Sequence, residues 1–197
     1  MSGVGAGDDI PIVVLALLAA VSWASMLVGV GIAAGGFERA RSAIALRFRR
    51  IDLVWVPIGV LAQLVVVPLV YIPLRAIWPS TFEPGRLEET ARGLMDSAGG
   101  LRTVLLVLVV AVGAPLVEEI VYRGMLQRSA VRRFGPVAGW IMASLFFAAV
   151  HLRPIELPGL AVAGAVFGVA ALRTDRLGGA VLAHAAFNAT GLLALFW

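Results

Sequence analysis

Long apolar runs separated by short charged segments dominate the chain. A membrane-spanning helix needs roughly 20 mainly apolar residues to cross about 30 Å of hydrocarbon. Uncharged runs of about this length or somewhat shorter occupy residues 10–37, 53–74, 103–117, 134–150, 157–172 and 177–197. Inside a bilayer the backbone polar groups must be satisfied within the segment, which favours helices. The pattern therefore predicts an all-α fold, a polytopic integral membrane helix bundle with about six transmembrane helices.

Composition strengthens this interpretation and removes several classes of site. Of the 197 residues, 60% are hydrophobic and only 14% are charged, whereas an average soluble domain is about 25% charged. This excludes an ordinary water-soluble globule, a disordered chain and a coiled coil. The chain has no Cys, which excludes a disulfide scaffold, an iron–sulfur site and a thiolate zinc site. All 16 basic residues are Arg, so a Schiff-base or P-loop lysine is excluded as well.

The charged segments predict the orientation in the membrane. Residues 38–50 carry five Arg, residues 123–133 carry four, and Arg173 and Arg176 form a third basic cluster. Basic loops remain on the cytoplasmic side, and six crossings with the N-terminus outside satisfy all three clusters. The acidic segment 79–100 then forms an external loop. We expect a multi-pass protein of the cell membrane, and the short loops and Arg-only basic set are typical of a bacterial plasma membrane.

The same pattern divides the chain into two regions. Residues 1–100 form an N-terminal two-span region with its basic cytoplasmic loop and the external loop, and residues 101–197 form a four-helix unit. Gly164 and Gly168 form a GxxxG pair within the fifth run. Such a pair permits close packing of helices, and we interpret it as structural.

Ionisable residues inside spans are costly and therefore point to function. Here they are few, and they include the only two His of the chain. These ionisable residues are Glu118, Glu119, Arg123, His151 and His184, and Asn188 is a polar neighbour.

Two adjacent carboxylates end the third run. Glu119 and Arg123 are spaced i, i+4, in the order that favours an ion pair on a helix. Glu118 points about 100° away and has no local partner. A desolvated carboxylate without a partner suits a general base. The alternative is that both carboxylates are solvated at the membrane surface.

The first histidine closes the fourth run. Phe147 and His151 are spaced i, i+4 and share a helix face. A turn at Gly135 and Pro136 would fold two helices into an antiparallel hairpin, which brings His151 level with residue 119. A carboxylate facing an imidazole can activate water. The alternative is a solvated histidine that caps the end of the helix.

The second histidine lies in the last run. His184 and Asn188 are spaced i, i+4 and must face the protein interior or a wet cavity. Side-chain donors aimed at one point can form an oxyanion hole, while a buried interhelical hydrogen-bond pair is the alternative. The number of residues between each His and its basic segment gives its depth in the membrane. At 1.5 Å per residue, His151 lies about 24 Å from its basic loop and His184 about 10 Å, so the two depths differ. Tilted helices, or a basic helix 119–134 that extends beyond the membrane, would reconcile them.

The three motifs, EExxxR, FxxxH and HxxxN in this order on successive apolar segments, resemble the CPBP family. This family comprises the CAAX prenyl endopeptidases, the bacteriocin-processing and bacteriocin-immunity proteins and the Abi proteins. The resemblance covers about residues 101–197 and implies an intramembrane endopeptidase that cleaves membrane-associated peptides or proteins, with no nucleic-acid partner. Every motif position is filled in this sequence.

The resemblance also implies roles for the residues. Glu118 and His151 would activate the attacking water, and His184 and Asn188 would stabilise the oxyanion. Three further residues would support the site, namely Glu119, Arg123 and Phe147.

The metal requirement stays open at this point. The family is often labelled as metalloproteases, while a metal-free glutamate mechanism also has support. The sequence has no HExxH, although Glu118, His151 and His184 would suffice for a catalytic zinc. Asn188 is a poor zinc ligand and a good hydrogen-bond donor, so we favour metal-independent chemistry with no cofactor.

Two other functions compete with the protease. A non-catalytic membrane protein similar to bacteriocin-immunity proteins would use the same polar residues as a structural network. A small transporter or proton relay would also place Glu and His within spans, but the chain shows no inverted repeat. A serine or threonine nucleophile is disfavoured, because Ser144 and Thr190 lack a nucleophile elbow.

Overall fold

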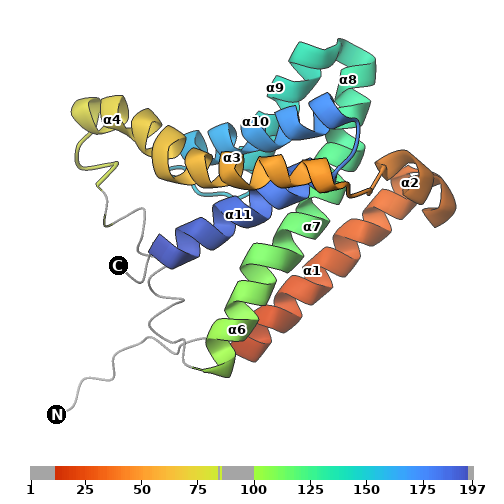
Figure 1. Ribbon diagram of the computed structural model, residues 1–197, viewed down its shortest axis with the longest axis horizontal. Coiled ribbons are helices and arrows are strands. Elements are labelled where there is room, and N and C mark those ends of the chain that lie inside the picture. Colours follow the sequence, from red (N-terminus) through yellow and green to blue (C-terminus); the bar gives the residue numbers. More distant parts are fainter. Residues whose placement is uncertain (1–11, 84, 86–99, 195–197) are drawn as a thin grey trace.

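The computed structural model describes residues 12–83, 85 and 100–194, and every regular element in this part of the chain is helical (Figure 1). The first helix is α1 (Ile12–Ala33), followed by the short α2 (Phe37–Ile44). The second long helix is composed of η1 (Arg50–Val54), α3 (Trp55–Leu61), η2 (Ala62–Val66) and α4 (Val67–Ile77). The third is composed of α6 (Leu101–Val107), η3 (Leu108–Gly113), α7 (Ala114–Glu119), η4 (Ile120–Gln127) and α8 (Arg128–Phe134). The last three are α9 (Pro136–Ala149), α10 (Leu157–Thr174) and α11 (Gly178–Ala194).

The protein is a polytopic helical membrane bundle, as the apolar runs predict. Four helices are long and apolar enough to cross a membrane, and they contain Ala16–Ala33, Arg50–Ile77, Thr103–Phe134 and Leu157–Thr174. The helices Pro136–Ala149 and Gly178–Ala194 are apolar but shorter. At 1.5 Å per residue the 14 residues of α9 extend only about 21 Å, less than the thickness of the hydrocarbon.

The third helix is much longer than its uncharged run. The sequence prediction placed a span at 103–117 and a basic loop at 123–133, but helix continues from Thr103 to Phe134. The basic segment is thus helical, which is the alternative of a basic helix 119–134 that the sequence analysis considered, since Arg is a good helix former and nothing breaks the helix before Gly135. Gly135 has φ +86° and is followed by Pro136 at the start of α9. The hairpin at this pair is therefore confirmed.

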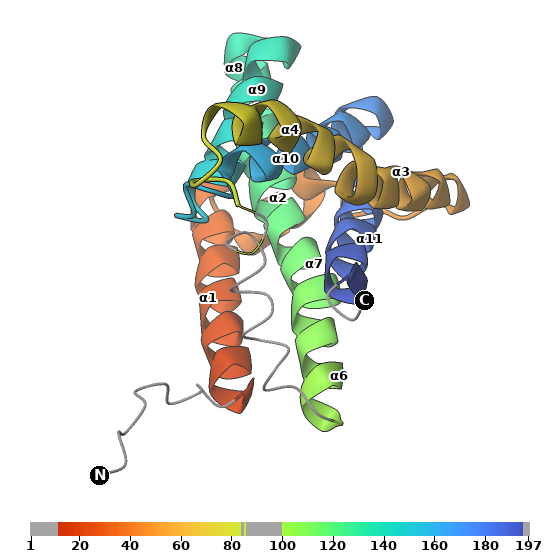
Figure 2. The same cartoon turned by 90° about the vertical axis from the view of Figure 1, so that its left-hand side faces the viewer.

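The helices pack around α11. Figure 2 shows α3 crossing α11, while α1 lies alongside α6 and α7. The crossing of α3 and α11 is close because Gly59 has no side chain: a Cβ there would collide with the backbone carbonyl of Ala183. α10 packs between α9 and α11, and its buried face consists mainly of small residues and Phe167.

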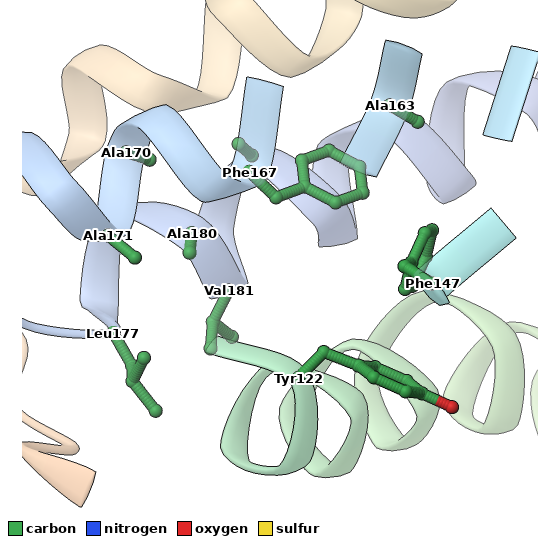
Figure 3. Close-up of a cluster of buried hydrophobic side chains, with 10 residues drawn as sticks. Tyr122, Phe147, Ala163, Phe167, Ala170, Ala171, Leu177, Ala180 and Val181 are labelled. Carbon is green, nitrogen blue, oxygen red and sulfur yellow. The ribbon is translucent and has the colours of Figure 1, made fainter. Parts of the chain in front are cut away.

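The core lies between these helices and the third helix. Figure 3 shows Phe147, Phe167 and Tyr122 at its centre, with small residues around them. Many apolar side chains on the outside are exposed, as on Leu17, Leu18 and other positions of α1, which is expected of surfaces that face lipid. The predicted external loop at 79–100 lies mostly outside the described residues.

Candidate active site

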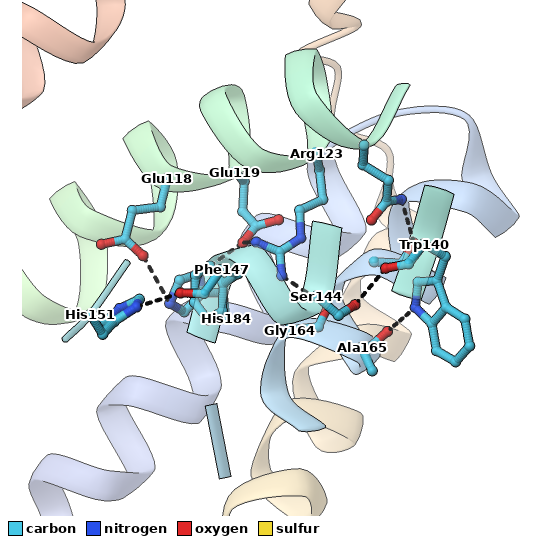
Figure 4. Close-up of polar contacts among 12 residues, drawn as sticks. Glu118, Glu119, Arg123, Trp140, Ser144, Phe147, His151, Gly164, Ala165 and His184 are labelled. Carbon is cyan, nitrogen blue, oxygen red and sulfur yellow. Dashed lines mark hydrogen bonds and ion pairs between the residues drawn. The ribbon is translucent and has the colours of Figure 1, made fainter. Parts of the chain in front are cut away.

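The polar residues singled out from the sequence come from three helices and meet at one place (Figure 4). Glu118 and Glu119 end α7, and Arg123 follows one turn later. The two carboxylates lie on a short α-helical stretch between the π-helical turns η3 and η4. π-Helical turns inside longer helices are frequent at functional sites. Pro115 favours such a turn here, because it cannot donate the backbone hydrogen bond that an α-helix requires.

Glu119 is the centre of a buried ion cluster. Its Oε1 lies 3.1 Å from Arg123 Nη1, which confirms the predicted ion pair. The same oxygen lies 2.9 Å from His184 Nδ1. All three side chains are buried. Breaking such a pair leaves an uncompensated buried charge, so the cluster ties η4 to α11 only while all its members are present.

Arg123 also holds the third helix against α10. Its Nη2 donates a hydrogen bond of 2.9 Å to the carbonyl of Gly164. One helical turn later, Gln127 Nε2 donates to the carbonyl of Gly168 at 3.0 Å. A Cβ at Gly168 would lie 2.6 Å from Gln127 Oε1. The GxxxG pair therefore allows the close packing that the sequence predicts, and it exposes two carbonyls to these side chains.

Glu118 lies on the other side of the His184 ring. Its Oε2 is 3.9 Å from His184 Nε2, beyond hydrogen-bonding distance, and 19% of its side chain is exposed. The imidazole therefore lies between two carboxylates, with one nitrogen toward each. Adjacent carboxylates point in different directions on a helix, and here they approach the same ring from its two sides.

Aromatic rings position both histidines. Phe147, the supporting residue of the second motif, contacts His151 and His184 edge-on at centroid distances of 4.8 and 5.7 Å. The guanidinium of Arg123 lies 4.5 Å from the centroid of the same ring. Phe167 stacks on His184 at 4.3 Å with an interplanar angle of 15°. The rings restrict how far either imidazole can rotate.

His151 follows the end of α9. Its Nδ1 lies 2.6 Å from the carbonyl of Phe147. Because a carbonyl can only accept, Nδ1 carries the proton in this contact and Nε2 is the nitrogen left for other partners. The next residue, Leu152, has φ +53°, a conformation that is unfavourable for a leucine, and it is 86% exposed. Backbone strain of this kind is concentrated at functional sites.

Tyr71 on α4 anchors the segment that follows His151. Its hydroxyl donates to the carbonyl of Ile155 at 2.9 Å and accepts from the backbone N–H of Gly159 at 3.3 Å. Arg153 and Glu156 form an ion pair in the same segment, with 2.6 Å between Nη1 and Oε1. The segment between α9 and α10 is thus held by contacts to the N-terminal half of the chain.

Asn188 lies one turn beyond His184 on α11. Its Nδ2 donates to the carbonyl of Val110 at 2.8 Å. Val110 belongs to the π-helical turn η3, where the irregular backbone makes a carbonyl accessible to a side chain. An amide nitrogen has two N–H groups, so the second one can serve another acceptor.

One cavity of about 260 Å³ brings the four predicted catalytic residues together. Glu118, His151, His184 and Asn188 all line it. The remaining walls are mainly apolar, formed by Val109, Val110, Ala114, Phe147, Leu160, Ala163, Phe167 and Phe187. An apolar cavity with a few convergent polar groups is the usual form of a small binding or catalytic site.

Glu118, His151 and His184, which the sequence analysis considered as ligands if zinc binds, are not grouped as a metal site in this arrangement. Among residues 12–83, 85 and 100–194, no three His, Asp or Glu side chains are grouped so that they could hold a metal ion. His184 Nδ1 is engaged by Glu119 and its Nε2 is 3.9 Å from Glu118.

Several polar or aromatic residues at or near the site escaped the sequence analysis. Phe167 and Tyr71 are single aromatic residues in apolar runs, and nothing in the sequence distinguishes them. Gln127 could have been found, because it extends the polar stripe of Glu119 and Arg123 by one more turn. Asp52, fully buried, accepts from Arg176 at 2.5 Å and ties the second long helix to the start of α11.

Residues 100–190, a little under half of the 197-residue chain, match the family model described as type II CAAX prenyl endopeptidase Rce1-like. This segment is similar to that family. The match agrees with the resemblance to the CPBP family. No curated protein and no solved structure matches the chain.

The Rce1-like segment contains all three motifs, from Glu118 to Asn188. This similarity supports an intramembrane protease, and the apolar helices are those of a multi-pass membrane protein. The second long helix precedes the matched segment, yet its Tyr71 contacts the backbone beside the site.

Proposed function

We propose that this protein is an intramembrane endopeptidase that hydrolyses peptide bonds of membrane-associated peptides or proteins. The observation that carries the proposal is the single cavity lined by Glu118, His151, His184 and Asn188. These four side chains supply a carboxylate base, two imidazoles and an amide donor, the groups that hydrolysis of an amide requires. The CAAX endopeptidase family of residues 100–190 supports the same reaction.

In the proposed reaction a water molecule binds between Glu118 and His151. Glu118 takes a proton from the water as its oxygen attacks the carbonyl carbon of the substrate. The carbonyl π bond breaks and its electron pair moves to oxygen, which forms the tetrahedral intermediate. The electron pair on the oxyanion then re-forms the carbonyl as the C–N bond breaks, and the proton held by Glu118 passes to the leaving nitrogen. His151 orients the water through Nε2, because Nδ1 is bound to the Phe147 carbonyl.

The oxyanion is proposed to lie near His184 and Asn188. Glu118, Glu119 and Arg123 carry a summed charge of −1, and a protonated His184 would bring the sum to zero. That form has a proton on Nε2, on the cavity side of the ring, while Nδ1 donates to Glu119. The second N–H of the Asn188 amide supplies the other donor. Donors fixed in advance stabilise developing charge best in a site of low dielectric.

Glu119, Arg123 and Phe147 are proposed as positioning residues. Glu119 sets the orientation of His184, and Arg123 compensates the charge of Glu119. Phe147 contacts both histidines and the guanidinium, so it fixes their mutual distances. We propose that the chemistry needs no metal, because His184 Nδ1 already has Glu119 as a partner and Asn188 is a poor zinc ligand.

The test compares protein termini in membranes from cells that express the wild type or Glu118→Gln at equal levels. Mass spectrometry of the membrane fraction should detect new termini only with the wild type, and these would also identify the substrate. Candidate peptides should then be cleaved by the purified wild type and not by His151→Ala. Purified wild type that cleaves no candidate, with identical termini in both membranes, would instead favour the non-catalytic, immunity-like function.

A further inference from the structure

A second and larger cavity lies outside the catalytic site. It has a volume of about 840 Å³ and lies where α1, α2 and the segment after α2 meet Ile120 of the third helix. Its walls are formed by Leu27, Val30, Phe37, Glu38, Ala40, Arg41, Ile44, Ala45, Leu46, Arg47 and Ile120. We call this cavity the α1–α2 groove. The function proposed above does not use it.

The α1–α2 groove has an apolar end and a basic end. Leu27, Val30 and Ile120 belong to the long helices and form the apolar part. Arg41 and Arg47 come from α2 and the segment after it. Both guanidiniums are exposed, and neither has a hydrogen bond or an ion pair to the residues that the structure describes. A groove lined by apolar side chains and by two cations without partners matches one acyl chain and one phosphate.

The groove also lies at the depth where lipid headgroups occur. α1 has 22 residues, about 33 Å by helical rise, so the segment that follows it lies at a membrane surface. Residues 38–50 carry five Arg and one Glu, a net charge of +4. Exposed apolar residues alternate with these Arg, including Leu46 and Phe48. This combination is typical of segments that bind anionic membrane surfaces.

The basic end is rigid. Ala45 has φ +53° and ends α2. The carbonyls of Ala45 and Arg47 accept hydrogen bonds from the backbone N–H groups of Leu177 and Gly178, at 3.2 and 3.1 Å. These bonds join the basic segment to the start of α11, the helix that carries His184.

The geometry points to the α1–α2 groove as a binding site for one anionic phospholipid molecule, with its phosphate between Arg41 and Arg47 and an acyl chain along Leu27, Val30 and Ile120. Glu38 disfavours a second negative charge, while the groove lining still has a net charge of +1. A bound lipid would stabilise the packing of α2 and the third helix. Ile44 of α2 contacts the third helix at Gly124, where a Cβ would lie 3.0 Å from Ile44 Cγ2.

The test measures lipid retention by the full-length protein. Protein purified in detergent is mixed with phosphatidylglycerol or phosphatidylcholine, and native mass spectrometry counts the bound molecules. The wild type should retain one phosphatidylglycerol in preference to phosphatidylcholine. The double variant Arg41→Gln/Arg47→Gln should bind it about 30-fold more weakly, because each arginine near an anionic lipid contributes about fivefold.

The matched control is Arg133→Gln/Arg173→Gln, which removes the same charge from exposed positions outside the groove. It should retain the lipid like the wild type, and so should Arg41→Lys/Arg47→Lys, which preserves the two charges. Equal loss in both glutamine variants would show a general surface attraction and overturn the proposal. Equal retention of phosphatidylcholine, of phosphatidylethanolamine or of a co-purified peptide in place of phosphatidylglycerol would overturn it too. The measurement needs no catalytic activity, so its outcome is independent of the proposed protease.

Discussion

His184 Nδ1 lies 2.9 Å from Glu119 Oε1, inside a cluster from which solvent is excluded. The second glutamate of the EExxxR motif therefore has two partners, Arg123 and His184, on two different helices. The first glutamate, Glu118, faces the cavity. Adjacent and chemically identical residues are thus in different environments, and their substitutions should have different consequences.

Glu119→Gln should destabilise the protein far more than Glu118→Gln. Removal of the Glu119 charge leaves Arg123 buried without compensation, which costs about 3–5 kcal/mol. Glu118 is partly exposed to the cavity, so its amide variant should retain stability to within about 1 kcal/mol. Thermal unfolding in detergent checks the difference.

Cleavage gives the second measurement for this pair. Loss of a general base typically reduces the rate about 10²–10⁴-fold, so Glu118→Gln should be folded and almost inactive. If Glu118→Gln retained most of its activity, the general-base role would have to be withdrawn.

Substitutions of Glu119 and Arg123 should have strongly non-additive effects on the free energy of unfolding. Arg123→Met alone leaves a buried carboxylate, whereas Glu119→Leu/Arg123→Met removes both charges at similar volume. Replacing a whole buried ion pair is often neutral, so the double variant should be more stable than the sum of the single effects by about 2 kcal/mol or more. It should still cleave more slowly than the wild type, since His184 Nδ1 loses its acceptor. A double variant as active as the wild type would mean that Glu119 does not position His184.

Gly59→Ala should disturb the site from a distance. The new methyl group would meet the backbone carbonyl of Ala183, next to His184, and backbone cannot move aside as a side chain can. We expect a lower unfolding temperature and reduced cleavage. Gly29→Ala on α1 is the control, because nothing lies within 4 Å of its Cβ position. There the helix should gain about 0.5–1 kcal/mol, and similar behaviour of the two variants would contradict the close crossing.

The sequence predicted the residues of the site better than the helix lengths and packing contacts that surround them. Glu118, His151 and His184 stand out because an ionisable residue in an apolar run has few structural explanations, and i, i+4 spacing gives each motif a common face. The ion pair of Glu119 and Arg123 follows from the same spacing and is confirmed.

The framework depends on tertiary contacts that no local pattern encodes. Phe167 is one apolar residue among many, and only the fold shows that it stacks on His184. The length of the third helix was missed because charge was taken as the end of a span, although a helix can extend beyond the membrane. The helix Thr103–Phe134 has 32 residues and is about 48 Å long, so it extends beyond a hydrocarbon layer of about 30 Å. The extended basic helix considered from the sequence is therefore the arrangement found.

Tyr71→Phe should lower both the catalytic rate and the stability. The lost hydroxyl bonds the segment after His151 at Ile155 and Gly159, and two such hydrogen bonds contribute about 1–3 kcal/mol. A looser segment would place His151 less accurately, so kcat should fall while KM changes little.

Tyr122→Phe is the matched control, because its hydroxyl has no hydrogen bond to the residues that the structure describes. Equal effects of the two substitutions on kcat would rule out a specific role for Tyr71.

Removal of metal should leave cleavage unchanged. The proposed water is activated by Glu118 and oriented by His151, and His184 already has Glu119 as a partner at Nδ1. We expect purified active protein to contain far less than one zinc per chain, and a chelator should not reduce its activity. Stoichiometric zinc, with activity lost to the chelator and restored by added zinc, would show that Glu118, His151 and His184 rearrange into a ligand set.

His184→Gln separates the two mechanisms further, because glutamine can still donate a hydrogen bond to an oxyanion but is a poor zinc ligand. In the metal-free mechanism this variant should retain measurable cleavage, and its zinc content should match that of the wild type.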